Sequence, residues 1–257
     1  MRGIQRVNVL GCPFDAISFV ETVECIRQAV QRNSSLQIVP GSIDFIIKSH
    51  KDSDYSRVLW HSDLVIADGK PIVWFASLLG NPINGRVSGT DLVWSCSEVS
   101  QELNCPVALL GGVGDTAARA AERMTAQFPG AQLHAIQTPY PLRPEHSRDL
   151  VAKVRSLGCK IVLIALGAPR QERWVQDYLP ECNANVGIGI GSAFDIICGD
   201  RIRAPRWMQN AGMEWLHRMI QEPRRLGKRY LIDDMRVFGY LATELLRRQT
   251  HPRRTNE

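Results

Sequence analysis

The stretch Leu64-Val65-Ile66-Ala67-Asp68-Gly69-Lys70-Pro71 decides how this chain folds. Four uncharged residues predict a buried strand, and they end abruptly in a carboxylate, a glycine and a lysine. A helical pattern follows, so the stretch is a strand-to-helix junction. Open α/β sheets bind ligands outside the carboxyl ends of their strands, which makes Asp68 the first candidate for chemistry. The alternative is that Asp68 caps the next helix, a position that Asp favours.

The same alternation of strand and helix recurs on both sides of this junction. Expected strands cover residues 6–10, 36–39, 64–67, 106–110, 132–136, 161–166 and 186–190. Helical patterns begin near residues 18, 43, 71, 116, 148 and 170. Residues 161–166 are purely aliphatic, as expected of a central parallel strand buried on both faces. The predicted fold class is α/β, a Rossmann-like parallel sheet with helices on both faces.

Polar or glycine residues follow the expected strands at one edge of this sheet. The series consists of Asp68, Gly112, Tyr140, Gln171 and Asp195. Because the carboxyl ends of parallel strands meet at the same edge, one shared ligand crevice explains the series better than separate capping events.

Length and composition are those of an ordinary globular protein. The 257 residues, 44% of them hydrophobic, can bury one core with a smaller appendage. The start lacks a signal peptide, and no stretch approaches the roughly 18 apolar residues of a membrane span, so a cytoplasmic protein is expected. Seven dispersed cysteines without a CxxC pair indicate neither a disulfide framework nor a zinc site.

The tail differs from the rest of the chain in charge. Residues 201–257 contain 13 Lys or Arg and 6 Asp or Glu, against 18 and 20 in residues 1–200. This difference predicts two parts, an α/β domain over residues 1–200 and a basic helical appendage over residues 201–257. Trp207, Ala211, Trp215 and Met219 recur at helical spacing, and a second helical stretch follows Pro223.

The sequence of this tail allows three interpretations. The first is a helical hairpin whose basic faces are simply solvated. The favoured one is contact with an anionic membrane surface or a diphosphate, because basic amphipathic helices that carry Trp suit both. Nucleic acid is disfavoured, since no nucleic-acid-binding module is recognisable.

The segment Arg86-Val87-Ser88-Gly89-Thr90-Asp91 also has two interpretations. Ser88 with Asp91 three residues later resembles a capped helix start. Arg86, just ahead of that helix, is alternatively a phosphate ligand assisted by the helix amides.

Glycines after the strand over 106–110 form a weak nucleotide signal. Gly112, Gly114 and Ala117 satisfy GxGxxA, but the expected acid about 20 residues on is missing, which disfavours a nicotinamide cofactor. A nucleotide diphosphate over glycine amides remains open. Asp52-Ser53-Asp54 is a DxD triplet that can hold a metal ion, but its surroundings favour an exposed helix start rich in acids.

Several motifs in series resemble the bacterial WecG/TagA/CpsF glycosyltransferase family. They are Ala67-Asp68-Gly69, residues 86–91, Leu109-Leu110-Gly111-Gly112, residues 167–172, and residues 203–208 through 222–225. The resemblance runs in the family's order from about Val39 to Tyr230.

The resemblance implies an inverting transfer of a sugar, often of N-acetylmannosamine type, from a UDP-sugar to a polyprenyl-diphosphate-linked acceptor at the inner face of the cytoplasmic membrane. It implies no metal and no cofactor. Asp68 matches the family's proposed general base, and Arg86 and Gln171 match its other catalytic positions, with Arg86 on phosphate or acceptor. The implied substrate-binding residues are Gly111, Gly112, Tyr140, Gly167, Arg170, Asp195, Arg218, Arg225 and Lys228, the last three in an appendage that folds over the site.

Two departures from the family's pattern bear on the acceptor. Pro40-Gly41-Ser42 stands where the family usually has Thr-Pro-Asn, which removes a hydroxyl and an amide. Lys228 stands in place of an arginine and lacks its bidentate fork.

Two other functions stay open beside the transferase. The first is a catalytically silent nucleotide-sugar-binding or scaffold protein of a polysaccharide assembly complex, and the second is a Rossmann-type oxidoreductase. A homo-oligomer is a further possibility, because an exposed Trp-rich tail can form a subunit interface.

Overall fold

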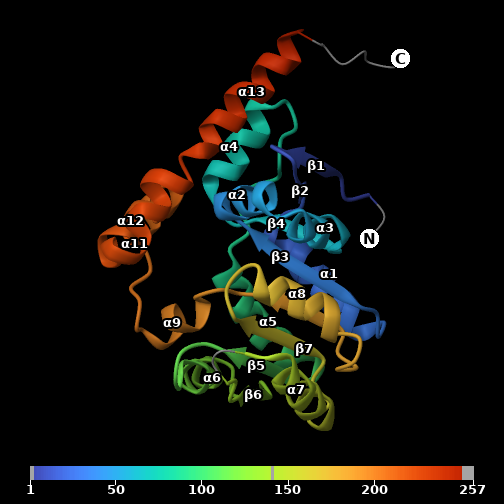
Figure 1. Ribbon diagram of the computed structural model, residues 1–257. Coiled ribbons are helices and arrows are strands. Elements are labelled where there is room, and N and C mark those ends of the chain that lie inside the picture. The colour runs from blue at the N-terminus through green and yellow to red at the C-terminus, as the bar shows by residue number, and fades with distance from the viewer. Residues whose placement is uncertain (1–2, 140–141, 251–257) are drawn as a thin grey trace.

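The computed structural model describes residues 3–139 and 142–250. A six-stranded sheet lies at its centre (Figure 1). Its strand order is β4-β3-β8-β7-β5-β6. Every neighbouring pair in this sheet is parallel. The strands are β3 (Leu36–Gly41), β4 (Leu64–Ala67), β5 (Val107–Gly111), β6 (Leu133–Ile136), β7 (Ile161–Ala165) and β8 (Val186–Gly189). The predicted α/β class with a parallel sheet is confirmed.

Helices cover both faces of the sheet, as predicted. One face packs against α1 (Phe19–Gln31), α5 (Gly89–Leu103), α6 (Thr116–Gln127) and α9 (Ala193–Cys198). The other face packs against α2 (Ile43–Lys51), α3 (Ser53–His61), α7 (Pro144–Ser156) and α8 (Arg170–Tyr178). Successive strand residues alternate between these faces: Ile38 lies in the first core, and Val39 lies in the second.

The first expected strand, over residues 6–10, is present as a strand but lies in a hairpin outside the parallel sheet. β1 (Arg6–Val9) pairs antiparallel with β2 (Cys12–Asp15) in a separate two-stranded sheet. The turn residues Leu10 and Gly11 both have positive φ, at 53° and 87°, the backbone that tight hairpins need. Leucine rarely adopts this conformation, so the sequence carries no strong turn signal here. The Asp15 carboxylate accepts a hydrogen bond of 2.7 Å from the Val65 N–H of β4.

The tail runs along the outside of the molecule (Figure 1). It forms α10 (Arg206–Asn210), α11 (Glu214–Gln221), α12 (Pro223–Lys228), a short π-helix η1 (Arg229–Asp233) and α13 (Arg236–Thr250). Val237 and Leu241 of α13 are buried in the core around α2. The expected continuous helical stripe from Trp207 to Met219 is wrong, because Gly212 has a φ of +67° and ends α10.

Gly212 also allows the tail to approach the helix that follows Asp68. A Cβ at position 212 would lie 2.3 Å from the ring of Trp74 in α4 (Lys70–Leu78). The stretch over residues 71–85 carries no charge, which predicts a buried helix, but its Trp74 and Leu78 are 45% and 62% exposed. Ile72, Phe75 and Ala76 form the buried side of this helix instead.

Candidate active site

Asp68 lies at the carboxyl end of β4, where the sequence places it. Its N–H donates to the Gly41 carbonyl at 2.9 Å, which continues the sheet by one residue. Its carboxylate accepts a hydrogen bond of 3.3 Å from the N–H of Gly89, the first residue of α5. The cap of α4 is Gly69, without any side-chain hydrogen bond, so the capping interpretation of Asp68 is wrong. The carboxylate lies at the start of a different helix and is 30% exposed.

Arg86 lies beside Asp68 in the segment between α4 and α5. The Val87 N–H donates to the Ala67 carbonyl at 2.9 Å and holds this segment against β4. Arg86 Nε lies 3.8 Å from Asp68 Oδ1, an ion pair without a hydrogen bond. The tail supplies two closer partners, Glu214 at 2.8 Å from Nη2 and Gln209 at 3.3 Å from Nη1. Arg86 is only 12% exposed, so it is a largely desolvated cation within the site.

Burial raises the pKa of the Asp68 carboxyl above its ordinary value. Arg86, Arg218 and the Gly89 N–H oppose that shift, whereas the negative charge of Glu214 adds to it. A carboxylate with a raised pKa is a stronger base, as removal of a proton from a hydroxyl requires.

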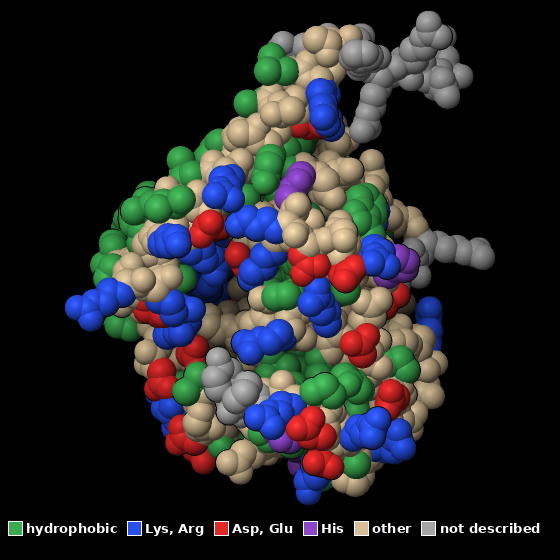
Figure 2. Space-filling model, viewed as in Figure 1, with side chains coloured by type: hydrophobic (Ala, Val, Ile, Leu, Met, Phe, Trp, Pro, Cys, Tyr) green, Lys and Arg blue, Asp and Glu red, His purple; other side chains and the backbone are tan. Residues whose placement is uncertain are grey.

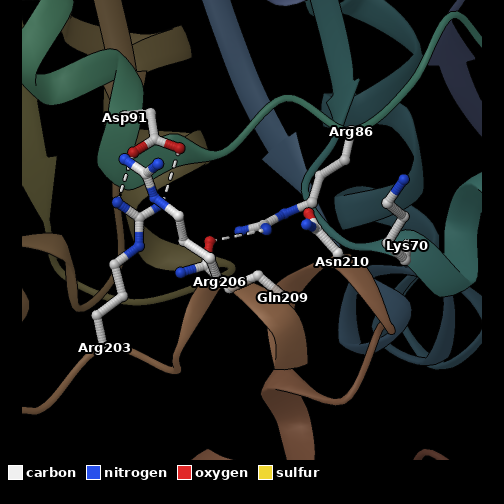
Figure 3. Close-up of a pocket in the computed structure, with 7 residues that line it drawn as sticks. All are labelled: Lys70, Arg86, Asp91, Arg203, Arg206, Gln209 and Asn210. Carbon is white, nitrogen blue, oxygen red and sulfur yellow. Dashed lines mark hydrogen bonds and ion pairs between the residues drawn. The ribbon is translucent and has the colours of Figure 1, made fainter.

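A basic cavity of about 410 Å³ opens next to these groups (Figure 3). Its lining residues are Lys70, Arg86, Asp91, Arg203, Arg206, Gln209 and Asn210. Arg203 binds Asp91 with both terminal nitrogens, at 2.6 and 2.7 Å. The predicted helix start at Ser88 is confirmed, because α5 begins directly after this residue. Ser88 makes no cap hydrogen bond, however, and Asp91 binds the tail, so side-chain capping does not explain the pair. With Asp91 neutralised, cations dominate the cavity and suit an anionic group.

The two glycines after β5 are needed for close packing. Gly111 has a φ of +86°, and a Cβ there would lie 2.5 Å from the Ala165 carbonyl oxygen of β7. Gly112 has a φ of +84°, and its Cβ would lie 2.2 Å from Thr116 Oγ1. Their N–H groups donate to Thr138 Oγ1 at 2.9 Å and to the Ala165 carbonyl at 3.0 Å. These two amides are thus engaged within the protein and not free to meet a diphosphate.

Gln171 joins the ends of β7 and β8 from inside the protein. Its side-chain oxygen accepts from the Gly167 N–H at 3.0 Å and from the Gly191 N–H at 3.2 Å. Its amide nitrogen donates to Glu172 at 2.6 Å, and the residue is fully buried. A sugar does not reach this amide in the present arrangement, so the geometry gives Gln171 a role in shaping the two loops.

Comparison with known proteins decides the class of this site. Residues 7–251 match the model of the "Glycosyl transferase WecG/TagA/CpsF family". The chain belongs to this family. It is a glycosyltransferase, which confirms the resemblance found in the sequence and overturns the oxidoreductase alternative.

Three relatives carry the same printed name, N-acetylglucosaminyldiphosphoundecaprenol N-acetyl-beta-D-mannosaminyltransferase. The Bacillus subtilis (strain 168) protein is 28% identical over 81% of this chain and 79% of its own length. The Bacillus spizizenii protein is 26% identical over the same shares of the two chains. The Staphylococcus aureus (strain MW2) protein is 22% identical over 95% of this chain and 94% of its own.

The tail of this WecG/TagA/CpsF family member brings some of the expected cations to the site. Arg218 reaches Glu214 at 3.6 Å and so lies near Arg86. Arg225 pairs with Glu222. Arg201 Nε lies 3.1 Å from Glu222 Oε1 and 3.3 Å from Asp195 Oδ2, so Arg201 bridges these two carboxylates. Burial raises the pKa of the Asp195 carboxyl. Lys228 and Arg170 are exposed, and Tyr140 lies outside the described residues.

The DxD triplet is an exposed helix start, as the sequence favours. Asp52 caps α3 by accepting from the Tyr55 N–H at 2.9 Å and pairs with Arg173 at 2.6 Å. Asp54 pairs with Arg57 on the surface. Within residues 3–139 and 142–250, no group of three or more His, Cys, Asp or Glu has a metal-holding arrangement. All seven cysteines are free thiols.

Sequence reasoning missed Glu172, a carboxyl buried in the core beneath the β7 and β8 loops. Burial raises the pKa of Glu172 to about 7. The hydrogen bond from Gln171 stabilises the charged form and offsets part of this rise. Tyr55 donates to it from 3.5 Å. An acid between Gln171 and Arg173 in an amphipathic helix carries no signal of burial, because the contact with Tyr55 spans 117 residues.

Glu172 should make the stability of the protein depend on pH. The folded state keeps the Glu172 proton up to about pH 7, whereas the unfolded state releases it near its ordinary pKa of about 4.3. The free energy of unfolding should therefore fall between these values as pH rises, by up to about 1.4 kcal/mol per pH unit. Urea unfolding at pH 5 and pH 8 should show this fall, and Glu172→Gln should remove most of it. An equal fall in the variant would contradict the assignment.

Proposed function

We propose that this glycosyltransferase moves an N-acetylmannosamine-type sugar from a UDP-sugar to a polyprenyl-diphosphate-linked N-acetylglucosamine, with inversion and without a metal ion. The observation that carries the proposal is the half-buried Asp68 carboxylate at the end of β4, beside Arg86 and the basic cavity. The shared name of the three relatives supports the choice of donor sugar and acceptor. Such acceptors serve the synthesis of cell-surface polysaccharides.

Asp68 acts as the general base. An acceptor hydroxyl donates its proton to the carboxylate while its oxygen attacks the anomeric carbon of the donor. The bond from that carbon to the UDP oxygen breaks on the opposite face, and UDP leaves with the electron pair. The raised pKa of Asp68 favours the proton transfer, and its 30% exposure leaves room for a substrate hydroxyl.

Cations replace a metal as the partners of the phosphate groups. Lys70, Arg86 and Arg206 line the basic cavity, and guanidinium groups bind phosphate oxygens in pairs. Figure 2 shows Lys and Arg side chains gathered around a hollow on one face of the molecule. We assign Arg218, Arg225 and Lys228 to the same task, with residues 201–257 serving as one appendage over the site. Gly167, Arg170, Asp195 and Tyr140 stay proposed substrate contacts.

The tail also presents an apolar surface that suits a lipid bilayer. Exposed apolar side chains occur on four of its elements, on the turn before α13 and on α4: Trp74, Leu78, Trp207, Trp215, Ile220, Leu231, Ile232, Met235 and Phe238. We refer to these nine residues as the apolar tail face. Basic residues flank it, and an acceptor with a polyprenyl chain resides in a membrane, so we propose peripheral binding at the inner face of the cytoplasmic membrane. Among the described residues, every helix is too short or too polar to span a bilayer.

Replacing Ile220 and Leu231 together by glutamine should weaken binding to anionic lipid vesicles by at least about tenfold, because each side chain loses the free energy of burial in lipid. Co-sedimentation with phosphatidylglycerol vesicles measures this. Val20→Gln, at a still more exposed position on α1, is the matched control and should bind like the parent protein. Undiminished binding of the double variant would remove the apolar tail face from membrane contact.

The first test of the proposed function is UDP release by the purified protein in EDTA. A panel of UDP-sugars is offered with and without a short-chain polyprenyl-diphosphate N-acetylglucosamine. Release that needs both UDP-N-acetylmannosamine and the acceptor would support the proposal. A strict requirement for Mn²⁺ or Mg²⁺ would contradict the metal-free mechanism and would make Asp52 and Asp54 candidate metal ligands. Binding of the UDP-sugar without any release, with acceptors from the producing cell as well, would favour the catalytically silent binding protein.

A further inference from the structure

Glu214 is a carboxylate that the tail inserts between two cations of the site. It lies at the start of α11, with Oε2 2.8 Å from Arg86 Nη2 and Oε1 3.6 Å from Arg218 Nη2. Its side chain is only 22% exposed. An ion pair of this geometry, shielded from water, constrains the Arg86 guanidinium more than a surface pair does.

This contact decides which side of Arg86 faces Asp68. Glu214 and Gln209 take the two terminal nitrogens, at 2.8 and 3.3 Å. Only Nε is left toward Asp68, at 3.8 Å, and it is a buried nitrogen without a hydrogen-bond acceptor. A bidentate pair between Arg86 and Asp68 would satisfy Nε and hold both carboxylate oxygens, so the tail keeps the arginine from the pairing that its position otherwise favours.

The charges around Asp68 come from three directions. Arg86 approaches from the segment before α5, the Gly89 N–H comes from α5 itself, and Glu214 and Arg218 come from α11. Lys70 follows Asp68 on α4, and Arg203 from the tail also interacts with the Asp68 charge. Glu214 is the negative member of this set, and its charge raises the pKa of Asp68, in the same direction as burial.

We infer that Glu214 is a positioning residue for the proton transfer: it holds Arg86 away from the Asp68 carboxylate and keeps that carboxylate able to accept a proton. The inference rests on the proposed role of Asp68 as general base. Because Glu214 belongs to α11, Asp68 gains this proton affinity only when the tail is in place over the site. An anionic phosphate that binds Arg86 competes with the Glu214 carboxylate for the same guanidinium, so the arginine that binds substrate also influences the basicity of Asp68.

The test is Glu214→Gln, which keeps an oxygen that can accept from Arg86 and removes the charge. The Asp68 carboxyl is followed by ¹³C NMR titration in aspartate-labelled protein, with its resonance identified by its loss in Asp68→Asn. Its midpoint should fall by roughly half a unit to one unit, the size expected for one charge several ångströms away at a partly exposed site. The acid limb of the kcat profile, measured with UDP-N-acetylmannosamine and the short-chain acceptor, should move to lower pH by the same amount.

Two further variants control this experiment. Glu244→Gln removes a tail carboxylate that pairs with Arg248 in α13 and should leave both midpoints unchanged. Glu214→Asp keeps the charge and should stay near the parent values. An unshifted Asp68 titration in folded Glu214→Gln would overturn the inference while Asp68→Asn remains inactive. Turnover retained in Asp68→Asn would instead overturn the proposed function itself.

Discussion

Asp68→Asn should lower kcat by about 10²–10⁴-fold, because asparagine has the size of aspartate but cannot accept the acceptor's proton. The Gly89 N–H can still donate to the side-chain oxygen of the amide, so the start of α5 should keep its place. Binding of the UDP-sugar should change little, since the basic cavity and its arginines remain. Rapid-quench turnover and calorimetric binding of the UDP-sugar measure the two effects separately.

Asp177→Asn is the matched control for this experiment. Asp177 is exposed on α8, and its replacement should leave kcat within about twofold of the parent, as is usual for surface substitutions. Parent activity should also fall as pH drops through the raised pKa of Asp68, since protonation removes the base. Unaltered turnover in Asp68→Asn would remove this carboxylate from the mechanism.

Gln171→Ala should lower the free energy of unfolding by about 2–4 kcal/mol, because the Gly167 and Gly191 N–H groups lose their common acceptor in a partly buried place. Turnover should fall as well, since the loops after β7 and β8 lose their link. A contact made only with the sugar would give a different result, a loss of activity without a loss of stability. Thermal and urea unfolding therefore distinguish the two roles.

The same helix provides the control for Gln171→Ala. Gln176 is exposed one and a half turns further along α8, and Gln176→Ala should change stability by less than about 0.5 kcal/mol. Gln171→Glu adds a second measurement, because it places a carboxyl where the amide nitrogen now donates to Glu172. One of the two carboxyls must then hold a proton, so this variant should be more stable at pH 5 than at pH 8 relative to the parent.

Local patterns predicted much of the fold from the sequence. The aliphatic run over residues 161–166 forms β7, and the helical pattern that begins near residue 18 forms α1, with a capping box at Ser18. The position of Asp68 after its strand is also a local property. The hairpin of β1 and β2 escaped prediction because Leu10 takes a conformation that leucine seldom adopts.

The remainder of the site depends on contacts between distant segments. Arg203 and Asp91 are 112 residues apart, and Gln209 and Arg86 are 123 apart. Neither the helical spacing of the apolar residues in the tail nor its charge reveals that Glu214 reaches Arg86. Trp74 and Leu78 likewise match a buried helix in an uncharged stretch, and only the packing of α4 determines that they face outward.

The Asp15 carboxylate protects an outer strand of the sheet from pairing with another chain. β4 is an outer strand of the sheet, and such a strand offers N–H groups that can template the addition of another chain. The hairpin places a carboxylate, held in turn by Arg6, on the Val65 N–H, where an intruding strand would need that donor. The strand that presents the proposed base is thereby guarded against aggregation by a residue at the beginning of the chain.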